Sequence, residues 1–410
     1  MIFIPILILL VSILIRLQKG MFAAFLLIVA TKSLVDAFWN IKFGPISILA
    51  IQGILFPVMF FKLFKEKKYF PKSWRGLAAC FFIALSLGVF WAFPTKPLGA
   101  FQILIININI FLGFFLIPIL VNSKKRLKQL LIAIMICGIF PVLVSMFQFQ
   151  TGVIFQQRAT VGLTRYVGFY HDAFPVRFYG LMTIIAALLY NFVFKLNTLF
   201  SKLRIVLVSL GALFSVYLVF SKAAVGIIGL WIVLLLVFSK SRAKHLLAIV
   251  IGGAIVFLIF GDAFTASIEQ LFSKEVGYQS GTVKDARYTL AGRGYIWQEH
   301  WHFWSTEQSV FFQWFGDGLN KPVHNEYLRV LMVNGIIGLI FLIVFLIRSI
   351  RNVFKIHKKI RIFAMMLLGM YFVDSIGLVP GVYYYYNILV WGIFGTLLLS
   401  PHLFIKKQDN

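Results

Sequence analysis

The chain has 410 residues, of which 61% are hydrophobic and 13% are charged, and its mean hydropathy is +0.93. A soluble domain cannot cover that much apolar surface, so the composition excludes a soluble globular protein. Apolar runs long enough to cross a bilayer core recur from end to end. They are expected to be helices, because a backbone in lipid must satisfy its own hydrogen bonds. The sequence therefore predicts an all-α polytopic membrane protein that forms a single transmembrane domain over residues 1–410.

The apolar runs, taken in chain order, are expected to form 12–13 transmembrane helices. The first run is short for a full crossing, which leaves its placement open. It also lacks a basic start and a small-residue cleavage site, so no cleavable signal is expected. Cys80 and Cys137 lie inside such runs and are expected to pack as small apolar residues rather than to form a disulfide. The expected helices lie at about 2–15, 21–39, 46–61, 76–93, 98–121, 129–149, 173–194, 205–220, 224–238, 246–262, 323–347, 362–379 and 383–404.

The formal net charge of +26 would fit nucleic-acid binding, but the positions of the charges indicate membrane topology instead. Alternate connections hold 26 of the 39 Lys and Arg residues and only two acidic residues, and such basic connections face the cytoplasm. Two longer segments, 150–172 and 263–322, then lie on the outer side. We therefore expect membrane lipids, and no nucleic acid, as partners. The basic connections are 16–20, 62–75, 122–128, 195–204, 239–245, 348–361 and 405–410.

The smaller outer segment, 150–172, concentrates arginine side chains beside a histidine-aspartate pair. Arginine presents a fork of donors that matches phosphate oxygens and keeps its charge, so the cluster fits the pyrophosphate headgroup of a lipid. The alternative is that these side chains extend to the lipid–water interface without binding a substrate. The candidate residues are Arg158, Arg165, Asp172 and, just beyond the segment, Arg177.

A short turn at Ser221-Lys222 places another cation on the same side of the membrane. A lysine that faces the protein interior at such a depth costs free energy and is often functional. Simple anchoring at the interface explains Lys222 equally well, so both interpretations stay open.

The larger outer segment, 263–322, far exceeds the usual connection of roughly 4–6 residues, which indicates a functional loop. If its central part is helical, Arg293, Trp297, Trp301 and Trp304 share one face. An aromatic face beside an arginine suits a sugar chain near a charged lipid head. An amphipathic helix that rests in the interface would show the same pattern.

His324 stands at the start of the expected helix 323–347, two residues after Pro322. Its imidazole titrates near neutrality and can take a proton from a sugar hydroxyl, although a buried histidine bonded to a backbone carbonyl would also fit this position. The neighbouring Asn325 is a candidate for substrate binding. Rival bases are Asp172, His300, Asp317 and Glu326.

Motifs of other chemistries are absent from the sequence. There is no GK[ST] phosphate loop and no dinucleotide fingerprint. His300 and His302 are two residues apart rather than at the four-residue spacing of a helical zinc site, and no DxD-like carboxylate pair stands at an early outer helix end. Neither a metal nor a cofactor is therefore expected.

Several of these residues together resemble the O-antigen ligase and O-antigen polymerase superfamily of bacterial envelope enzymes. The strongest piece is His324-Asn325, followed after nine residues by Gly335-Ile336-Ile337-Gly338, which is similar to the family's His-Asn…Gly-x-x-Gly signature. The resemblance covers roughly residues 150–345 and, through the hydropathy profile, the rest of the chain. Further similar pieces are Arg293 with Trp297, Phe315-Gly316-Asp317-Gly318, Ser221-Lys222-Ala223-Ala224 and Arg165-x-x-Gly168-x-x-His171.

The chain also departs from the family pattern. Lys222 stands where relatives carry Arg, Ala223 stands in place of their Gly, and Asp172 stands where relatives often carry Pro. These departures leave the roles of Lys222 and Asp172 open.

The resemblance implies a GT-C-like fold with a long, partly helical periplasmic loop. It also implies that a glycan on undecaprenyl pyrophosphate is transferred as a block on the periplasmic side of the inner membrane, without metal or nucleotide sugar. Arg165 and Arg293 would hold the pyrophosphate leaving group and His324 would activate the acceptor hydroxyl, with inversion at the anomeric carbon. We expect these side chains to converge on an outward-facing cavity roofed by 263–322. The remaining substrate-binding candidates are Arg158, Arg177, Lys222, Asn325, Trp297, His300 and Asp172.

The acceptor distinguishes a polymerase from a ligase. Segment 263–322 carries five basic and six acidic residues, which favours a second lipid-linked repeat over a large anionic lipid A-core as acceptor. The expected activity is thus that of an O-antigen polymerase, with a chain-length regulator as a possible partner and a ligase as the alternative. A transporter or flippase is more distant, because transporters place ionisable residues near the bilayer midplane and the helix interiors here are nearly free of charge. The exceptions are Lys32, Asp36 and Asp374.

Overall fold

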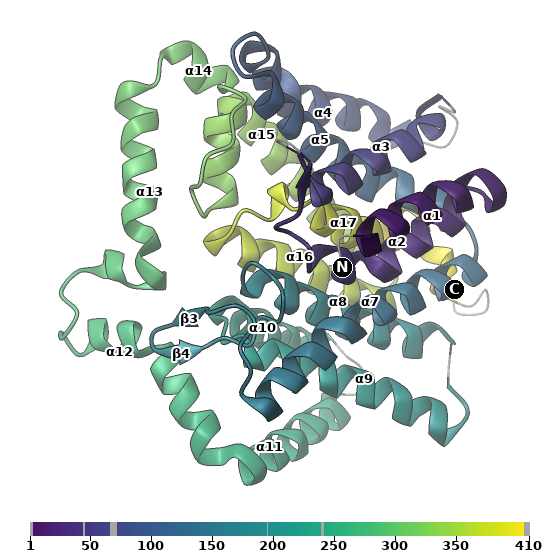
Figure 1. The fold of residues 1–410 in the computed structure, drawn as a ribbon, viewed down its shortest axis with the longest axis vertical. Helices are drawn as coiled ribbons and strands as arrows, with labels where there is room; N and C mark the ends of the chain where they lie inside the picture. Colours follow the sequence, from purple (N-terminus) through teal and green to yellow (C-terminus); the bar gives the residue numbers. More distant parts are fainter. Residues whose placement is uncertain (1–2, 44–45, 66–71, 195, 239–241, 406–410) are drawn as a thin grey trace.

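The computed structural model describes residues 3–43, 46–65, 72–194, 196–238 and 242–405. Within these residues the chain is helical almost throughout (Figure 1). The strands among them form two short antiparallel ribbons, β1 (Lys42–Phe43) with β2 (Ile46–Ser47) and β3 (Ala159–Thr160) with β4 (Leu163–Thr164). The prediction of an all-α protein is therefore confirmed for the described part of the chain.

Every apolar run of the sequence corresponds to a helix or to a continuous helical stretch. Between residues 97 and 120 the pitch changes, because α5 (Pro97–Phe111) passes through a π-helical turn, Leu112–Leu116, into α6 (Ile117–Leu120). The other long helices are α1 (Phe3–Lys19), α2 (Met21–Asp36), α3 (Ile48–Lys65), α4 (Lys72–Ala92), α7 (Lys124–Thr151), α8 (Ala173–Phe194), α9 (Leu199–Leu218), α10 (Lys222–Phe238), α11 (Arg242–Leu271), α15 (Glu326–Lys355), α16 (Lys358–Gly377) and α17 (Tyr384–Leu399).

Six helices in the described ranges are long and apolar enough to cross a membrane, and several other apolar helices are shorter. The faces that these helices turn away from the bundle are strongly apolar: on α9, Leu199 is 83% exposed and Leu207 is 58% exposed. Such faces are stable only in lipid, so the chain is a multi-pass membrane protein. The six spans are Pro97–Leu120, Lys124–Thr151, Ala173–Phe194, Leu199–Leu218, Glu326–Lys355 and Lys358–Gly377.

Helix α17 lies in the centre of the bundle, where almost all of its side chains are buried (Figure 1). Trp391 of α17 packs edge-on against Phe345 of α15, and Phe345 packs in the same way against Phe114. Backbones also approach closely, since a Cβ on Gly395 would lie 2.2 Å from the carbonyl oxygen of Phe114. Small residues permit this approach, which is the usual way in which membrane helices gain packing energy.

The start of α15 is shaped by a glycine contact. Gly335 has φ 68° and ψ −175°, which interrupts the helix. A Cβ on Gly335 would lie 2.2 Å from the carbonyl oxygen of Trp314, and one on Gly316 would lie 2.1 Å from that of Val333. Gly316 and Gly335 belong to the two glycine motifs of the sequence, and they allow the segment before His324 to lie directly on the backbone of α15.

The segments 152–172 and 272–325 lie at one end of the bundle, which we call the site end. From α11 the chain continues through α12 (Ser273–Gln279), α13 (Arg293–His302) and α14 (Val310–Phe315), which form an arc beside the bundle (Figure 1). The arc is tied to the bundle at several points. The Gln270 amide donates to the carbonyl of Val161 at 2.9 Å, and the rings of Phe311 and Trp91 meet edge to face at 5.1 Å.

Candidate functional site

Arg165 is held in place by the segment that carries it. The Gly168 amide, at φ 63°, donates to the Gln148 side chain at 2.6 Å, which closes the segment onto α7. The Tyr166 amide donates to the carbonyl of Leu218 at 3.2 Å. The guanidinium of Arg165 donates to the carbonyl of Phe220 at 3.1 Å. Segment 152–172 is thereby docked on the turn between α9 and α10.

The surroundings of Arg165 are electropositive. Burial lowers the pKa of Arg165, the charge of Arg293 lowers it further, and the carboxylate of Asp172 acts in the opposite direction. The guanidinium nevertheless stays protonated, since arginine does not lose its proton in proteins.

Arg177 is buried inside the bundle rather than turned toward solvent. One of its terminal nitrogens is paired with the carboxylate of Asp374 on α16, and the other donates to the Ser221 hydroxyl at 3.1 Å. Only 3% of the Arg177 side chain is exposed. Arg177 therefore joins α8 to α16 and to the turn before α10. Its positive charge also lowers the pKa of Arg165 and that of Arg293.

Lys222 has a partner in the arc formed by α12, α13 and α14. Its ammonium lies 2.6 Å from each carboxylate oxygen of Glu275 on α12. The same carboxylate accepts a hydrogen bond from the Leu290 amide at 2.9 Å. Lys222 thus joins the bundle to the arc by an ion pair, a contact that the sequence does not reveal.

Arg293 opens α13 and reaches across to α16. A Cβ on Gly377 would lie 3.0 Å from a terminal nitrogen of Arg293, so the absent side chain leaves room for the guanidinium. Burial lowers the pKa of Arg293, and the charge of Arg177 adds to this effect. Among the described residues, Arg293 makes no hydrogen bond and no ion pair. Its donors are therefore available to an anion.

His324 is an exposed side chain on a strained backbone. Its φ is 50°, a left-handed value that is rare outside glycine. Its carbonyl accepts a hydrogen bond from the Trp297 indole at 3.3 Å, which links the turn to α13. The pKa of His324 is lowered by partial burial and by the charges of Arg293 and His300, against a smaller opposite effect of Asp172. The imidazole is therefore neutral at pH 7 and able to accept a proton.

Asn325 uses its amide within the protein. Its side-chain oxygen caps α15 by accepting from the Leu328 amide at 3.0 Å, and its nitrogen donates to the carbonyl of Ile376 at 3.3 Å. The cap explains why α15 begins one residue later, at Glu326. These bonds give Asn325 a structural task beside the substrate-binding role expected from the sequence.

The remaining members of the first outer segment lie at its edge. Arg158 is exposed and donates to the carbonyl of His171 at 2.7 Å. Asp172 accepts from the Phe174 amide at 2.7 Å and so caps the start of α8. Its other oxygen lies 3.9 Å from the His171 ring, and its charge acts on both Arg165 and His324. His300 is half-buried on α13, and burial lowers its pKa.

Strained backbone is concentrated at the site end. Besides Val161 in the β3–β4 hairpin, the non-glycine residues with positive φ in the described chain are Phe220, Leu290, Ala291 and His324. Phe220 binds Arg165 through its carbonyl, Leu290 and Ala291 precede Arg293, and His324 is the candidate base. Each such residue costs about 1–2 kcal/mol, and strain of this kind collects at functional sites.

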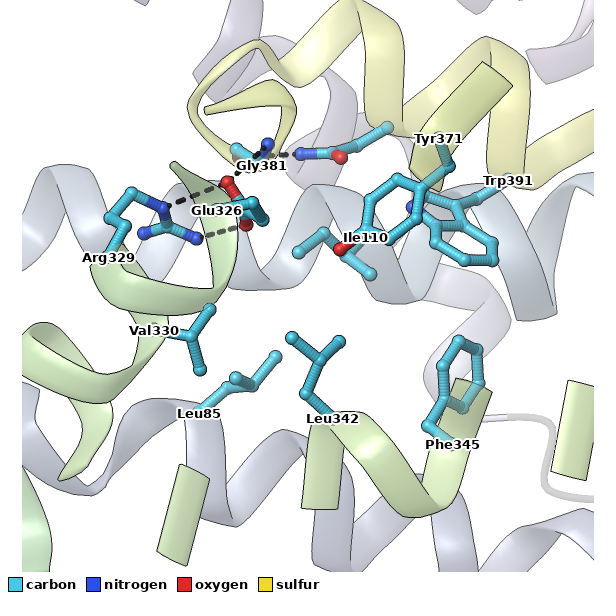
Figure 2. A pocket seen from close by; sticks show the side chains of 11 residues that line it. Leu85, Ile110, Glu326, Arg329, Val330, Leu342, Phe345, Tyr371, Gly381 and Trp391 are labelled. Atoms are coloured by element: carbon cyan, nitrogen blue, oxygen red, sulfur yellow. Dashed lines mark hydrogen bonds and ion pairs between the residues drawn. The ribbon is translucent and has the colours of Figure 1, made fainter. Parts of the chain in front are cut away.

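Two rival bases are engaged elsewhere. Glu326 is 2% exposed, and its carboxylate accepts from Arg329 at 2.7 Å and from the Gly381 amide at 3.1 Å (Figure 2). Asp317 is paired with Lys321 at 2.7 Å. The Glu326–Arg329 ion pair was not predicted from the sequence. An acidic residue and an arginine three residues apart in an apolar helix do, however, indicate such a pair.

The structure also contains a small cavity beside Glu326. It lies inside the bundle and has a volume of about 10 Å³, room for one water molecule. Figure 2 shows the Glu326–Arg329 pair at one side of it and Tyr371 with Trp391 at the other. The site-end cluster of Arg165, Arg293 and His324 does not line this cavity.

The tertiary structure thus gathers one set of candidates and separates another. Arg293 and Asp172 act on the pKa of both Arg165 and His324, and His300 acts on that of His324. Trp297 is bonded to the His324 turn. Arg177, Lys222 and Asn325 serve contacts between helices, and Arg158 lies at the rim. In comparisons with protein-family models and with curated proteins, the sequence matches none of them.

Proposed function

We propose that this protein is a membrane glycosyltransferase that acts on a pyrophosphate-linked lipid, and specifically an O-antigen polymerase. The observation that carries the proposal is the convergence of Arg165, Arg293 and His324 at the site end. They come from three separate segments. Arg165 donates to the carbonyl of Phe220, which precedes Ser221, the partner of Arg177. Arg293 reaches Gly377 on α16, and the carbonyl of the preceding residue, Ile376, accepts from Asn325, the neighbour of His324. A guanidinium pair beside a neutral imidazole supplies the groups that a transfer from a pyrophosphate requires.

The electrostatics of the cluster favour an anionic ligand. Arg165, Arg177 and Arg293 bring three positive charges together, against the two carboxylates of Asp172 and Asp374. Repulsion between like charges is relieved when an anion lies between them, and arginine forks match phosphate oxygens in pairs. The guanidinium of Arg293, which has no bond to any residue that the structure describes, supports binding of a pyrophosphate in particular.

The chemistry would proceed in one displacement. The acceptor hydroxyl oxygen forms a bond to the anomeric carbon, and its proton passes to a ring nitrogen of His324. The bond between that carbon and the pyrophosphate oxygen breaks, and the oxygen keeps the electron pair. Arg165 and Arg293 stabilise the charge that develops on the leaving pyrophosphate. Attack opposite the leaving group inverts the anomeric centre.

The topology proposed with this function has 12–13 transmembrane helices in a GT-C-like arrangement. The basic connections would face the cytoplasm, and segments 150–172 and 263–322 would lie in the periplasm of a bacterial inner membrane. The exposed imidazole would then meet its substrates at the outer surface of the bilayer, where an undecaprenyl chain presents its headgroup.

The net acidity of segment 263–322 supports the polymerase over the ligase. It carries five basic and six acidic residues, a poor surface for the strongly anionic lipid A-core. The acceptor would therefore be a second lipid-linked repeat, and a chain-length regulator would be a further partner. The ligase remains the second candidate, because the same three side chains would serve it equally.

The test compares lipopolysaccharide from cells that carry the gene, lack it, or carry a variant. Deletion should leave a single repeat on the core, whereas bare core with accumulated lipid-linked polymer would identify a ligase. Arg293→Ala and His324→Ala should each reduce transfer roughly 10²–10³-fold at unchanged membrane levels. Arg204→Ala, an exposed arginine of α9, is the matched control and should behave as wild type. Normal polymer in either site variant would refute the assigned roles.

A further inference from the structure

The segment that carries Arg293 is a compact unit. Arg287 is paired with Asp285 at 2.6 Å and donates to the Gln298 side chain on α13 at 2.7 Å. The Tyr295 hydroxyl donates to the same Asp285 carboxylate at 2.8 Å. A Cβ on Gly294 would lie 2.8 Å from the Cα of Arg287, so the backbone at Arg287 packs directly against the first turn of α13. These contacts join residues 285–298 into the unit that carries Arg293.

The chain that enters this unit is strained. Leu290, Ala291 and Gly292 have φ values of 50°, 61° and 76°, three left-handed residues in succession immediately before Arg293. Glycine adopts this conformation freely, but leucine and alanine do not. Such a turn persists only where its surroundings hold it.

Glu275 is the group that holds the turn. Its carboxylate accepts from the Leu290 amide at 2.9 Å and from Lys222 at 2.6 Å, so one side chain joins the strained turn to the first residue of α10. Burial raises the pKa of Glu275, but the bonds from Lys222 and Leu290 outweigh it and lower the pKa below its ordinary value. The carboxylate is thus charged at neutral pH and keeps both bonds.

We propose that Glu275 is a positioning residue whose link from Lys222 to Leu290 places Arg293 in the site. Lys222 then acts on the substrate through Glu275 and Arg293 rather than as a direct phosphate ligand. The pyrophosphate part of this inference rests on the proposed function, whereas the mechanical link does not. Trp297, bonded to the carbonyl of His324, is the second point at which the unit is attached.

The mechanical link can be tested without any substrate. Hydrogen–deuterium exchange of the full-length protein in nanodiscs should show that Glu275→Gln and Lys222→Gln each speed exchange of amides 286–298 about tenfold, as expected for a lost charged hydrogen bond. Glu269→Gln makes the same chemical change on α11, where no ion pair is present among the described residues, and should leave exchange unchanged. Unchanged exchange in both link variants would overturn the proposal.

The effect on Arg293 is tested by a double-mutant cycle with undecaprenyl pyrophosphate as the probe. Arg293→Ala and Glu275→Gln should each weaken its binding about tenfold, and the double variant should be no weaker than Arg293→Ala alone, because both remove the same interaction. Losses that multiply would show that Glu275 acts independently of Arg293 and would overturn its positioning role. If the wild-type protein fails to bind the probe while exchange responds as expected, the proposed substrate is wrong and the link stands.

Discussion

Replacing Asn325 by alanine should loosen the start of α15 rather than only remove a substrate contact. In the structure the Asn325 amide oxygen caps the Leu328 amide at 3.0 Å, and its nitrogen donates to the carbonyl of Ile376 at 3.3 Å. Both bonds hold the turn that carries His324. The alanine variant loses both, whereas Asn325→Ser keeps a capping oxygen and loses only the bond to α16.

The magnitude follows from these two bonds. Loss of the cap costs about 1 kcal/mol, and loss of the bond to Ile376 costs about 1 kcal/mol more. A local cost of about 2 kcal/mol speeds opening of the first turn of α15 roughly 30-fold, since each 1.4 kcal/mol is a factor of ten. The serine variant should lose about half of this free energy and open only about fivefold faster.

Hydrogen exchange at amides 326–330 is the appropriate assay, because the opening is local. Asn352→Ala is the matched control, since the Asn352 side chain bonds to the Arg348 carbonyl within the same helix, far from its start. It should leave exchange at 326–330 unchanged. The capping argument is wrong if Asn325→Ala exchanges like wild type at these amides yet loses glycan transfer, because the side chain would then act on the substrate directly.

Other predictions concern His324 and the glycine contact. The kcat/KM for transfer should fall as the pH drops through a pKa below the ordinary histidine value of about 6.5, because the imidazole of His324 must be neutral to act as a base. Arg293→Gln removes a positive charge and should therefore raise this pKa. A lowered pKa in that variant would contradict the assignment. His324→Gly should be inactive, but thermal unfolding should show it to be about 1 kcal/mol more stable than His324→Ala, because glycine adopts the left-handed conformation without strain. Equal stability of these two variants would argue against strain at residue 324. Gly335→Ala should destabilise the protein by about 3 kcal/mol and lower its yield as a monodisperse species, since the new Cβ would lie 2.2 Å from the Trp314 carbonyl oxygen. In the control variant Gly229→Ala the new Cβ meets no atom within 4 Å, so this variant should be tolerated. Equal yields of the two variants would refute the contact.

The sequence predicted the helices well because their determinants are local. A run of apolar residues has few alternatives to a helix in lipid, so hydropathy located every long helix, although some ends differ from the expected ones by five to nine residues. Ends were less accurate: the run expected at 246–262 lies within α11 (Arg242–Leu271), which continues into the segment expected to be an outer loop. The loop itself contains short helices, and the aromatic face expected there is only partly regular, because α13 ends at His302 and the chain turns into a π-helix before Trp304.

The candidate site shows the same division. Arg293 and His324 were recognisable because charged and titratable side chains stand out beside apolar helices, and the structure brings them together. The partners of Lys222 and Arg177 were not recognisable. Glu275 lies 53 residues from Lys222, and Asp374 lies 197 residues from Arg177. No spacing rule connects such positions.

By itself, then, the amino-acid order determined that this chain crosses a membrane as helices, which ends of those helices carry charge, and which charged and titratable side chains stand beside them. Those properties depend on solvation and on neighbours within a few residues. Only the tertiary structure decided that Arg177, Lys222 and Asn325 bond across helices, while the side chains of Arg293 and His324 have no hydrogen-bond partner in the described part of the chain. Which polar side chains find a partner depends on which helices become neighbours. Packing between distant segments, rather than local propensity, determines those neighbours.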